Sequence, residues 1–148
     1  MQKYITKNFE ETQKLGEDFA KEILRQAQDK TSTTAVVLVL QGDLGGGKTT
    51  FLQGFAKGLG IKEKVLSPTY IIYRKFKIKN NKYFYHFDCY RINKPEEILE
   101  LGWNDIISDP NNIVTVEWPE KTKKYIPKTA IKIKFKFIDN NTREIMLR

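Results

Sequence analysis

Three predicted elements follow one another without interruption between residues 35 and 59, and they constrain the fold more than any other part of the chain. Residues 35–40 are Ala-Val-Val-Leu-Val-Leu, an apolar run typical of a parallel strand that is buried on both faces. Residues 42–49 read Gly-Asp-Leu-Gly-Gly-Gly-Lys-Thr and fit the pattern G-x-x-x-x-G-K-[ST] at every fixed position. Apolar residues then recur on one face of 49–59, as expected for a helix. We therefore predict a strand, a phosphate-binding loop and a helix, the opening unit of a P-loop NTPase fold.

The chemistry of this loop assigns its residues to a nucleotide. Glycines allow successive backbone N–H groups to turn inward around phosphate oxygens, and the N-terminus of the following helix also favours an anion. Lys48 is expected to reach the β- and γ-phosphates, and the Thr49 hydroxyl is expected to bind Mg²⁺. A glycine-rich turn without a ligand is the alternative, but it would not explain the strand and helix on either side. The predicted nucleotide-binding residues are Asp43, Leu44, Gly45, Gly46, Gly47, Lys48, Thr49 and Thr50.

A phosphate-binding loop also needs a carboxylate at the end of a neighbouring buried strand, to hold Mg²⁺ directly or through water. Glu117 follows the apolar run 113–116, and Asp88 follows 83–87. Either acid could serve, and the alternative for each is a surface acid at the end of a strand. His86 is the only histidine, and one histidine with one carboxylate makes a poor transition-metal site, so we expect a packed or hydrogen-bonded side chain. Cys89 is expected to be buried.

The remaining pattern predicts an α/β fold. We expect a short strand at residues 4–5, a helix at 8–28, a short helix at 95–101 and a strand at 113–116. Hairpins are expected at 70–88, turning at Asn80-Asn81, and at 131–147, turning at 139–141. In the helix 8–28, Leu15, Phe19, Ile23 and Ala27 should form the buried stripe. Together these elements predict a mostly parallel central sheet flanked by helices, with antiparallel hairpins, in a single domain spanning residues 1–148.

Length and composition exclude several classes of protein. A chain of 148 residues suits one domain with one core, and no apolar run approaches the roughly 20 residues of a membrane helix. The first residues lack the apolar segment of a secretory signal, and Cys89 is the only cysteine, so no structural disulfide is expected. We expect a cytoplasmic protein.

Positive charge is concentrated near the C-terminus of a chain whose net charge is +8. Lys132, Lys134 and Lys136 alternate with apolar residues that are expected to be buried, at 131, 133, 135 and 137. This lysine stripe could follow a nucleic-acid backbone. It could equally protect an exposed edge strand from aggregation or serve solubility.

Four motifs in this order resemble the TsaE family, the ATPase component of the bacterial machinery that makes threonylcarbamoyladenosine in tRNA. They are Gly42–Thr50, Ser67-Pro68-Thr69-Tyr70, His86-x-Asp88-x-Tyr90-Arg91 and Glu117-Trp118-x-Glu120. The resemblance extends from Phe9 to about Arg143. Gly46 stands where the family usually has alanine, and Cys89 where it usually has leucine. Neither difference removes a functional group.

The resemblance implies a subunit that binds and hydrolyses ATP with Mg²⁺. That activity would support the threonylcarbamoyl modification of adenosine 37, next to the anticodon of tRNAs that read codons beginning with A. The implied partners are the transferase subunit and its inactive paralogue, with tRNA contacted through the complex. By motif, Thr69 matches a switch threonine near the γ-phosphate, Asp88 the catalytic acid and Glu117 the Mg²⁺ ligand. Asn8 and Thr142 are the candidate adenine contacts.

Two other functions fit parts of the sequence. A small-molecule kinase would share the loop, but it needs an acceptor site and usually a mobile lid carrying several arginines. The five arginines here are spread along the chain, at positions 25, 74, 91, 143 and 148. An RNA-binding module would explain the basic C-terminal hairpin but would leave the phosphate-binding loop without a role.

Overall fold

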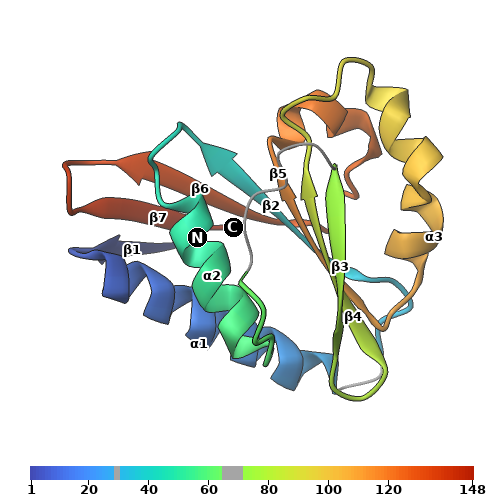
Figure 1. Cartoon of the computed structure of the whole chain (residues 1–148), viewed down its shortest axis with the longest axis horizontal. Coiled ribbons are helices and arrows are strands. Elements are labelled where there is room, and N and C mark those ends of the chain that lie inside the picture. The colour runs from blue at the N-terminus through green and yellow to red at the C-terminus, as the bar shows by residue number, and fades with distance from the viewer. Residues whose placement is uncertain (29–30, 65–71) are drawn as a thin grey trace. The chain divides into compact units, whose positions relative to one another are not determined.

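The computed structural model describes residues 1–28, 31–64 and 72–148. Its internal contacts group into two compact units (Figure 1). The first unit contains residues 1–31, 42–67 and 133–148, and the second contains 32–41 and 68–132. No helix in the described part of the chain is long and apolar enough to cross a membrane.

The first unit combines three antiparallel strands with two helices. Strand β7 (Arg143–Leu147) pairs on one side with β1 (Gln2–Thr6) and on the other with β6 (Ile131–Phe137). Helices α1 (Phe9–Ala27) and α2 (Lys48–Gly58) lie side by side (Figure 1). The predicted strand at residues 4–5, both helices and the terminal hairpin are thereby confirmed.

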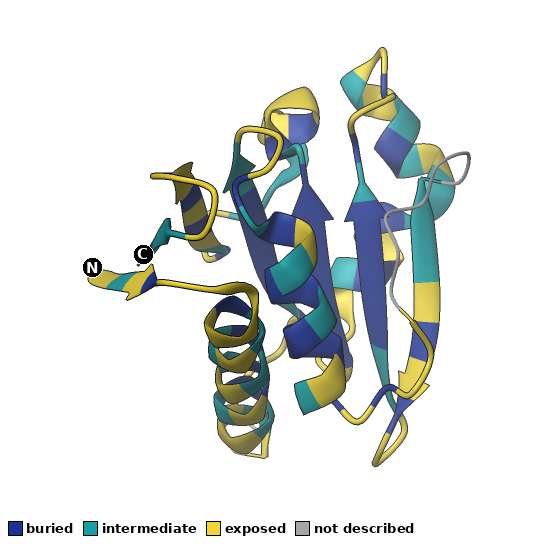
Figure 2. Ribbon diagram, turned by 60° about the vertical axis from the view of Figure 1, so that its left-hand side comes forward, coloured by how far each residue is buried: buried dark blue, intermediate teal, exposed yellow. Residues whose placement is uncertain are grey.

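The two helices approach each other through glycines, which changes the buried stripe of α1. Its buried residues are Thr12, Gly16, Ala20 and Ile23, and Figure 2 shows mostly exposed residues on the opposite side of the helix. A Cβ atom on Gly16 would lie 2.2 Å from the Phe51 carbonyl oxygen, so only glycine allows this separation. Of the four residues expected in the buried stripe, Ile23 is buried, whereas Leu15, Phe19 and Ala27 are half-buried. Phe19 still packs against Phe51 and Phe55 of α2.

Gly54 makes the tightest of these contacts, and its replacement by alanine is expected to destabilise the protein. The new Cβ would lie 1.9 Å from the backbone oxygen of Gln13, which cannot move aside as a flexible side chain would. Alanine gains about 0.5–1 kcal/mol in helix propensity, but overpacking costs about 1–3 kcal/mol and sometimes more. We expect a lower free energy of unfolding in urea. Lys57→Ala, on the exposed side of the same helix, is the matched control, and equal stability of the two variants would contradict the packing argument.

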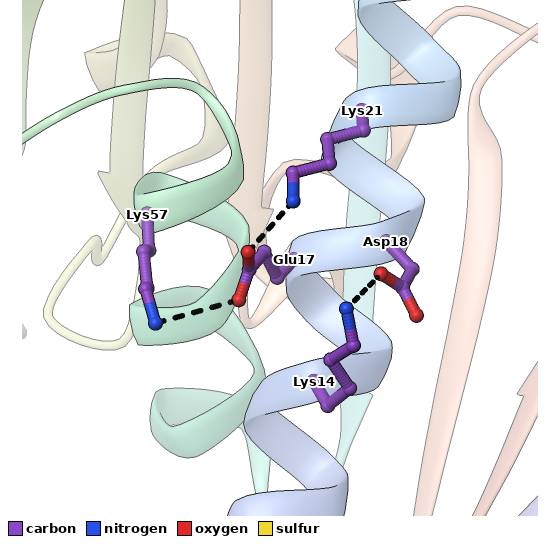
Figure 3. Close-up of polar contacts among 5 residues, drawn as sticks. All are labelled: Lys14, Glu17, Asp18, Lys21 and Lys57. Atoms are coloured by element: carbon purple, nitrogen blue, oxygen red, sulfur yellow. Dashed lines mark hydrogen bonds and ion pairs between the residues drawn. The ribbon is translucent and has the colours of Figure 1, made fainter.

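Charged side chains form ion pairs along and between the same two helices (Figure 3). Lys14 pairs with Asp18 and Lys21 with Glu17, each at 2.8 Å, and the second oxygen of Glu17 lies 3.6 Å from Lys57 of α2. The hydrogen bond from Lys21 is the main cause that lowers the pKa of Glu17. Because the three lysines and Asp18 are exposed, these pairs add little to the stability of the helix contact.

The second unit contains four strands in the order β2, β5, β4, β3. Strand β5 (Asn112–Glu117) pairs parallel with both β2 (Val36–Gly42) and β4 (Lys82–Asp88). Strand β3 (Tyr73–Ile78) pairs antiparallel with β4. Asn80 and Asn81 adopt φ values of 63° and 58°, as a type I′ hairpin turn requires. The predicted parallel pairs and both hairpins are confirmed. The expectation of a mostly parallel sheet was wrong, because the strands joined by short hairpin turns pair antiparallel and make the sheet mixed.

Short helices cover one face of these four strands. They are η1 (Pro95–Leu101), α3 (Trp103–Ser108) and η2 (Pro119–Tyr125). Trp103 is fully buried there, packs edge-on against Phe87 and donates a hydrogen bond from Nε1 to the Tyr125 carbonyl oxygen. Helix α3 was not predicted from the sequence, whereas the short helix ending near Gly102 was.

The opposite face of the same strands carries the polar residues. Side chains alternate along a strand, so Val37, Phe87 and Val116 point into the apolar core. Their neighbours point the other way, and this second face includes His86, Asp88, Thr115 and Glu117.

The lysine stripe alternates as expected, with Lys132, Lys134 and Lys136 exposed and with Ile133 and Phe135 buried. The expected burial of Phe137 was wrong, since 48% of it is exposed at the end of β6. Its ring is instead covered by the guanidinium of Arg143, which lies 4.7 Å from the ring centroid.

Candidate functional site

The backbone between β2 and α2 has the curvature of a phosphate-binding loop. Gly42, Gly45 and Gly47 have φ values of 146°, 79° and 99°, which favour glycine. A Cβ atom on Gly42 would lie 2.4 Å from the Phe135 carbonyl oxygen, so this position also lacks room for a side chain. Gly47 precedes the first turn of α2, and no side chain caps that turn. Its N–H groups can therefore serve an anion.

The Lys48 side chain connects the two ends of the loop by a hydrogen bond. The residue is only 6% exposed, and its Nζ donates a hydrogen bond to the carbonyl oxygen of Gly42 at the other end of the loop. Thr49 is exposed on the first turn of α2, and Leu44 is 79% exposed. The ammonium group is thus held over the loop, where phosphate oxygens are expected.

Gly46 replaces the usual alanine without strain in the backbone. It lacks a positive φ, and an added Cβ would meet the Asp43 carbonyl oxygen at 3.0 Å and the Phe135 Cβ at 3.3 Å. A methyl group would therefore be tightly packed against Asp43 and β6, and its absence removes no functional group.

Arg143 lies beside the loop, a contact that reasoning from the sequence missed. Its Cγ and Cδ atoms are 3.4 and 3.7 Å from the place of a Cβ on Gly47. Its Nη1 donates hydrogen bonds to the carbonyl oxygens of Asp139 at 2.6 Å and Thr142 at 3.0 Å. Its Nε is buried and has no hydrogen-bond partner among the described residues. The pairing of β1, β7 and β6 brings this cation to the loop, and sequence spacing alone does not indicate such a contact.

The candidate adenine contacts are both engaged in local structure. Asn8 caps α1, its Oδ1 accepting the Glu11 N–H at 2.8 Å. Thr142 directly precedes Arg143, and its N–H donates to Asp139 Oδ1 at 2.8 Å. Both residues stay predictions as adenine contacts.

The two predicted acids end adjacent parallel strands of the second unit. Asp88 and Glu117 are register partners, and Glu117 is also in register with Leu40 of β2. Leu40 lies two residues before Gly42, where the glycine-rich loop begins. The carboxyl ends of parallel strands are the usual place for ligands in α/β sheets. Asp88 is half-buried, and its Oδ1 accepts the Tyr90 N–H at 3.0 Å.

Glu117 is more deeply buried than a surface acid at the end of a strand would be. It is 3% exposed, and its Oε2 lies 2.8 Å from Nε2 of His86, which is 1% exposed. The expected hydrogen-bonded histidine is confirmed. No group of three His, Cys, Asp or Glu side chains within the described residues could hold a metal ion. A single carboxylate is still an oxygen donor of the kind that Mg²⁺ prefers, because this ion keeps several waters and binds substrate phosphates.

Aromatic side chains follow the two acids. Trp118 has a φ of 56°, unusual for a bulky residue, and its ring centroid lies 5.1 Å from that of Tyr90. Tyr90 is 55% exposed. The motif Ser67–Tyr70, with the predicted Thr69, lies outside the described residues.

Cys89 is buried as expected, and we predict that its thiol is unreactive in the folded protein. Burial raises the pKa of the Cys89 thiol from 9.0 to about 12. At neutral pH the thiolate form is therefore about a thousandfold less populated than it would be for an exposed cysteine. Its reaction with an aromatic disulfide reagent at pH 8 should be slow in buffer and complete in denaturant, where the one thiol per chain is released. Rapid reaction of the native protein would contradict this assignment.

Comparison with known proteins identifies the family. A family model described as "Threonylcarbamoyl adenosine biosynthesis protein TsaE" matches residues 6–145. The chain belongs to the TsaE family. A relative from Haemophilus influenzae, named tRNA threonylcarbamoyladenosine biosynthesis protein TsaE, is 35% identical over 86% of this chain and 77% of its own length.

A second relative and a solved structure support this assignment. A relative of the same name from Rickettsia felis is 33% identical over 94% of this chain and 75% of its own length. The crystal structure of Bacillus subtilis YdiB is 29% identical, covers 99% of this chain and 83% of its own, and superposes with a TM-score of 0.69. The expected family and its α/β fold are thereby confirmed.

Proposed function

We propose that this TsaE-family chain is a cytoplasmic Mg²⁺-dependent ATPase subunit acting as one domain. It would support formation of the threonylcarbamoyl group on adenosine 37 of tRNAs that read codons beginning with A. The transferase subunit and its inactive paralogue would be its partners, and tRNA would be met through their complex. The relatives' names support the pathway. The observation that carries the ATPase role is the glycine loop, whose buried Lys48 is held over it by Gly42.

The residues divide the chemistry between them. Loop N–H groups and Lys48 would bind the phosphates, while the Thr49 hydroxyl and the Glu117 carboxylate are hard oxygen donors suited to Mg²⁺. When bound, Mg²⁺ would neutralise charge on the phosphate oxygens. Asp88 would orient or deprotonate the attacking water, and Thr69 would act as a switch near the γ-phosphate.

Hydrolysis assays test this proposal. Phosphate release from ATP is measured for the chain alone and with its two partner proteins, and the modified nucleoside in tRNA is quantified by mass spectrometry. We expect free phosphate and a modification that depends on this chain. Labelled phosphate on a small acceptor instead would favour the kinase alternative, and partner-independent modification would exclude the proposed role.

Arg143 is expected to contact a phosphate of the bound nucleotide, because its stem lies against Gly47 and its buried Nε has no partner among the described residues. Hydrogen bonds to charged groups contribute about 1.5–3 kcal/mol. Arg143→Gln should therefore weaken ATP binding about tenfold to a hundredfold, measured by calorimetry. Arg148→Gln, which removes an exposed arginine at the end of the chain, should have little effect.

Tripolyphosphate, which lacks a base and a ribose, identifies the part of the nucleotide that Arg143 meets. If the contact is to phosphate, Arg143→Gln weakens tripolyphosphate and ATP alike. A loss confined to ATP would instead place Arg143 against the base or ribose, beside the candidate contacts Asn8 and Thr142.

A further inference from the structure

A buried histidine lies behind the carboxylate that is proposed to bind Mg²⁺. His86 and Glu117 are 1% and 3% exposed, and Nε2 of the first lies 2.8 Å from Oε2 of the second. His86 comes two residues before Asp88 on β4 and is the register partner of Thr115, two residues before Glu117 on β5. The histidine side chain therefore reaches diagonally toward the end of the neighbouring strand.

Burial makes this hydrogen bond important. A carboxylate removed from water is costly unless it is hydrogen-bonded or paired, and a glutamate side chain has three torsions that must be fixed for it to bind a metal. Among the described residues, His86 is the side chain that donates to Glu117. Mg²⁺ prefers oxygen ligands, so His86 itself does not suit the metal.

The imidazole is buried, and its Nδ1 has no hydrogen-bond partner among the described residues. Its ring lies within 3° of the plane of the Phe84 ring, with centroids 6.5 Å apart, and Phe84 is fully buried. Parallel pairing on β5 fixes the backbone on one side, and antiparallel pairing with Arg74 of β3 fixes it on the other. A donor whose backbone is paired on both sides favours one orientation of the acceptor.

We propose that His86 is a positioning residue, whose Nε2–H holds the Glu117 carboxylate in the orientation that binds Mg²⁺ with the nucleotide. This inference rests on the proposed function of Glu117 as the Mg²⁺ ligand. It assigns His86 a role in metal affinity rather than in the chemical step. Hydrogen-bond partners of metal ligands typically contribute tenfold to a hundredfold to metal affinity.

Three variants separate the hydrogen bond from simple packing. His86→Phe keeps a ring next to Phe84 but removes the donor, whereas His86→Gln offers an amide N–H near the place of Nε2. Thr115→Val is the matched control, because its hydroxyl is buried on the same face with no partner among the described residues. Removing an unpaired buried hydroxyl should leave stability nearly unchanged.

ATP affinity is measured by calorimetry at a series of Mg²⁺ concentrations. The quantity compared between variants is the Mg²⁺ concentration that gives half of the full increase in ATP affinity. We expect His86→Phe to raise it about tenfold to a hundredfold, with Mg²⁺-free ATP affinity unchanged. His86→Gln should recover much of this loss, and Thr115→Val should match the native protein. Circular dichroism and melting temperature show whether each variant is folded. If His86→Phe does not fold, exchange of the His86 Nε2 proton in the native protein and in Glu117→Ala provides the test.

A second readout does not depend on the metal. The chain has one histidine, so ¹⁵N-histidine labelling gives the resonances of a single imidazole. Nε2 should carry a proton that exchanges slowly with water, and Glu117→Ala should speed this exchange while Thr115→Val should not. A native Nε2 proton in fast exchange would overturn the proposed hydrogen bond.

The variants also distinguish the inference from the function on which it rests. Glu117→Gln alone reports on the metal ligand, and an unchanged Mg²⁺ dependence would reject its role and the inference with it. A Glu117→Gln variant that needs more Mg²⁺, beside a His86→Phe variant that does not, rejects only the inference. Adding His86→Phe to Glu117→Gln should cause no further loss, and a full additional loss would show that His86 acts by another route.

Discussion

Replacing Lys48 with alanine is expected to reduce ATP affinity by about tenfold to a hundredfold, since a hydrogen bond to a charged group is worth about 1.5–3 kcal/mol. The ammonium is 6% exposed and is directed across the loop to the Gly42 carbonyl oxygen. A partly desolvated cation interacts more strongly with phosphate than an exposed one, because little water screens it. Isothermal titration with Mg²⁺-ATP measures the loss directly.

The control for this experiment is an exposed lysine on the same helix. Lys57→Ala removes equal charge and a similar stem from the last turn of α2, where the ion pair to Glu17 is solvated. It should bind ATP normally. If Lys48→Ala binds as tightly as Lys57→Ala, the loop does not bind phosphate and the proposed function fails at its first step.

Those features of the fold that depend on local sequence were predictable. The apolar run before Gly42 gave a buried strand, and Asn80-Asn81 gave the hairpin turn with positive φ at both residues. Each depends on burial or backbone preference within a few residues. The buried stripe of α1 was not predictable in this way, because it is set by Gly16 and Gly54, whose missing side chains become significant only when two helices meet.

In the candidate site, too, local features were predictable from the sequence and contacts between distant residues were not. Loop residues 42–50 are contiguous, so their pattern alone was enough to predict them as nucleotide-binding residues. The contact of Arg143 with Gly47 depends on how β7 pairs, and the hydrogen bond of His86 to Glu117 depends on a diagonal between two parallel strands. Such contacts join residues that are far apart in sequence. A motif search could single out His86 and Glu117, but only the register shows that they form a buried pair.

Asp88→Asn is expected to abolish most ATP turnover while leaving ATP binding almost intact. Asparagine has the same shape as aspartate, and its side-chain oxygen can still accept the Tyr90 N–H that Asp88 accepts at 3.0 Å. Only the charge and the ability to take a proton are lost. General base catalysis typically contributes about a hundredfold to ten-thousandfold, so turnover with the partner proteins should fall by that factor.

Glu117→Gln is the matched substitution on the neighbouring strand, and the two variants should fail in different ways. Asp88 and Glu117 are register partners, so each variant makes the same chemical change at the same level of the sheet. The glutamine variant should need more Mg²⁺ and regain turnover when Mg²⁺ is raised, because its defect is in metal binding. The asparagine variant should not recover, because its defect is in the attack of water. If instead both variants lose ATP binding equally and hydrolyse each bound ATP at the native rate, the two acids hold the nucleotide and neither performs the assigned chemistry.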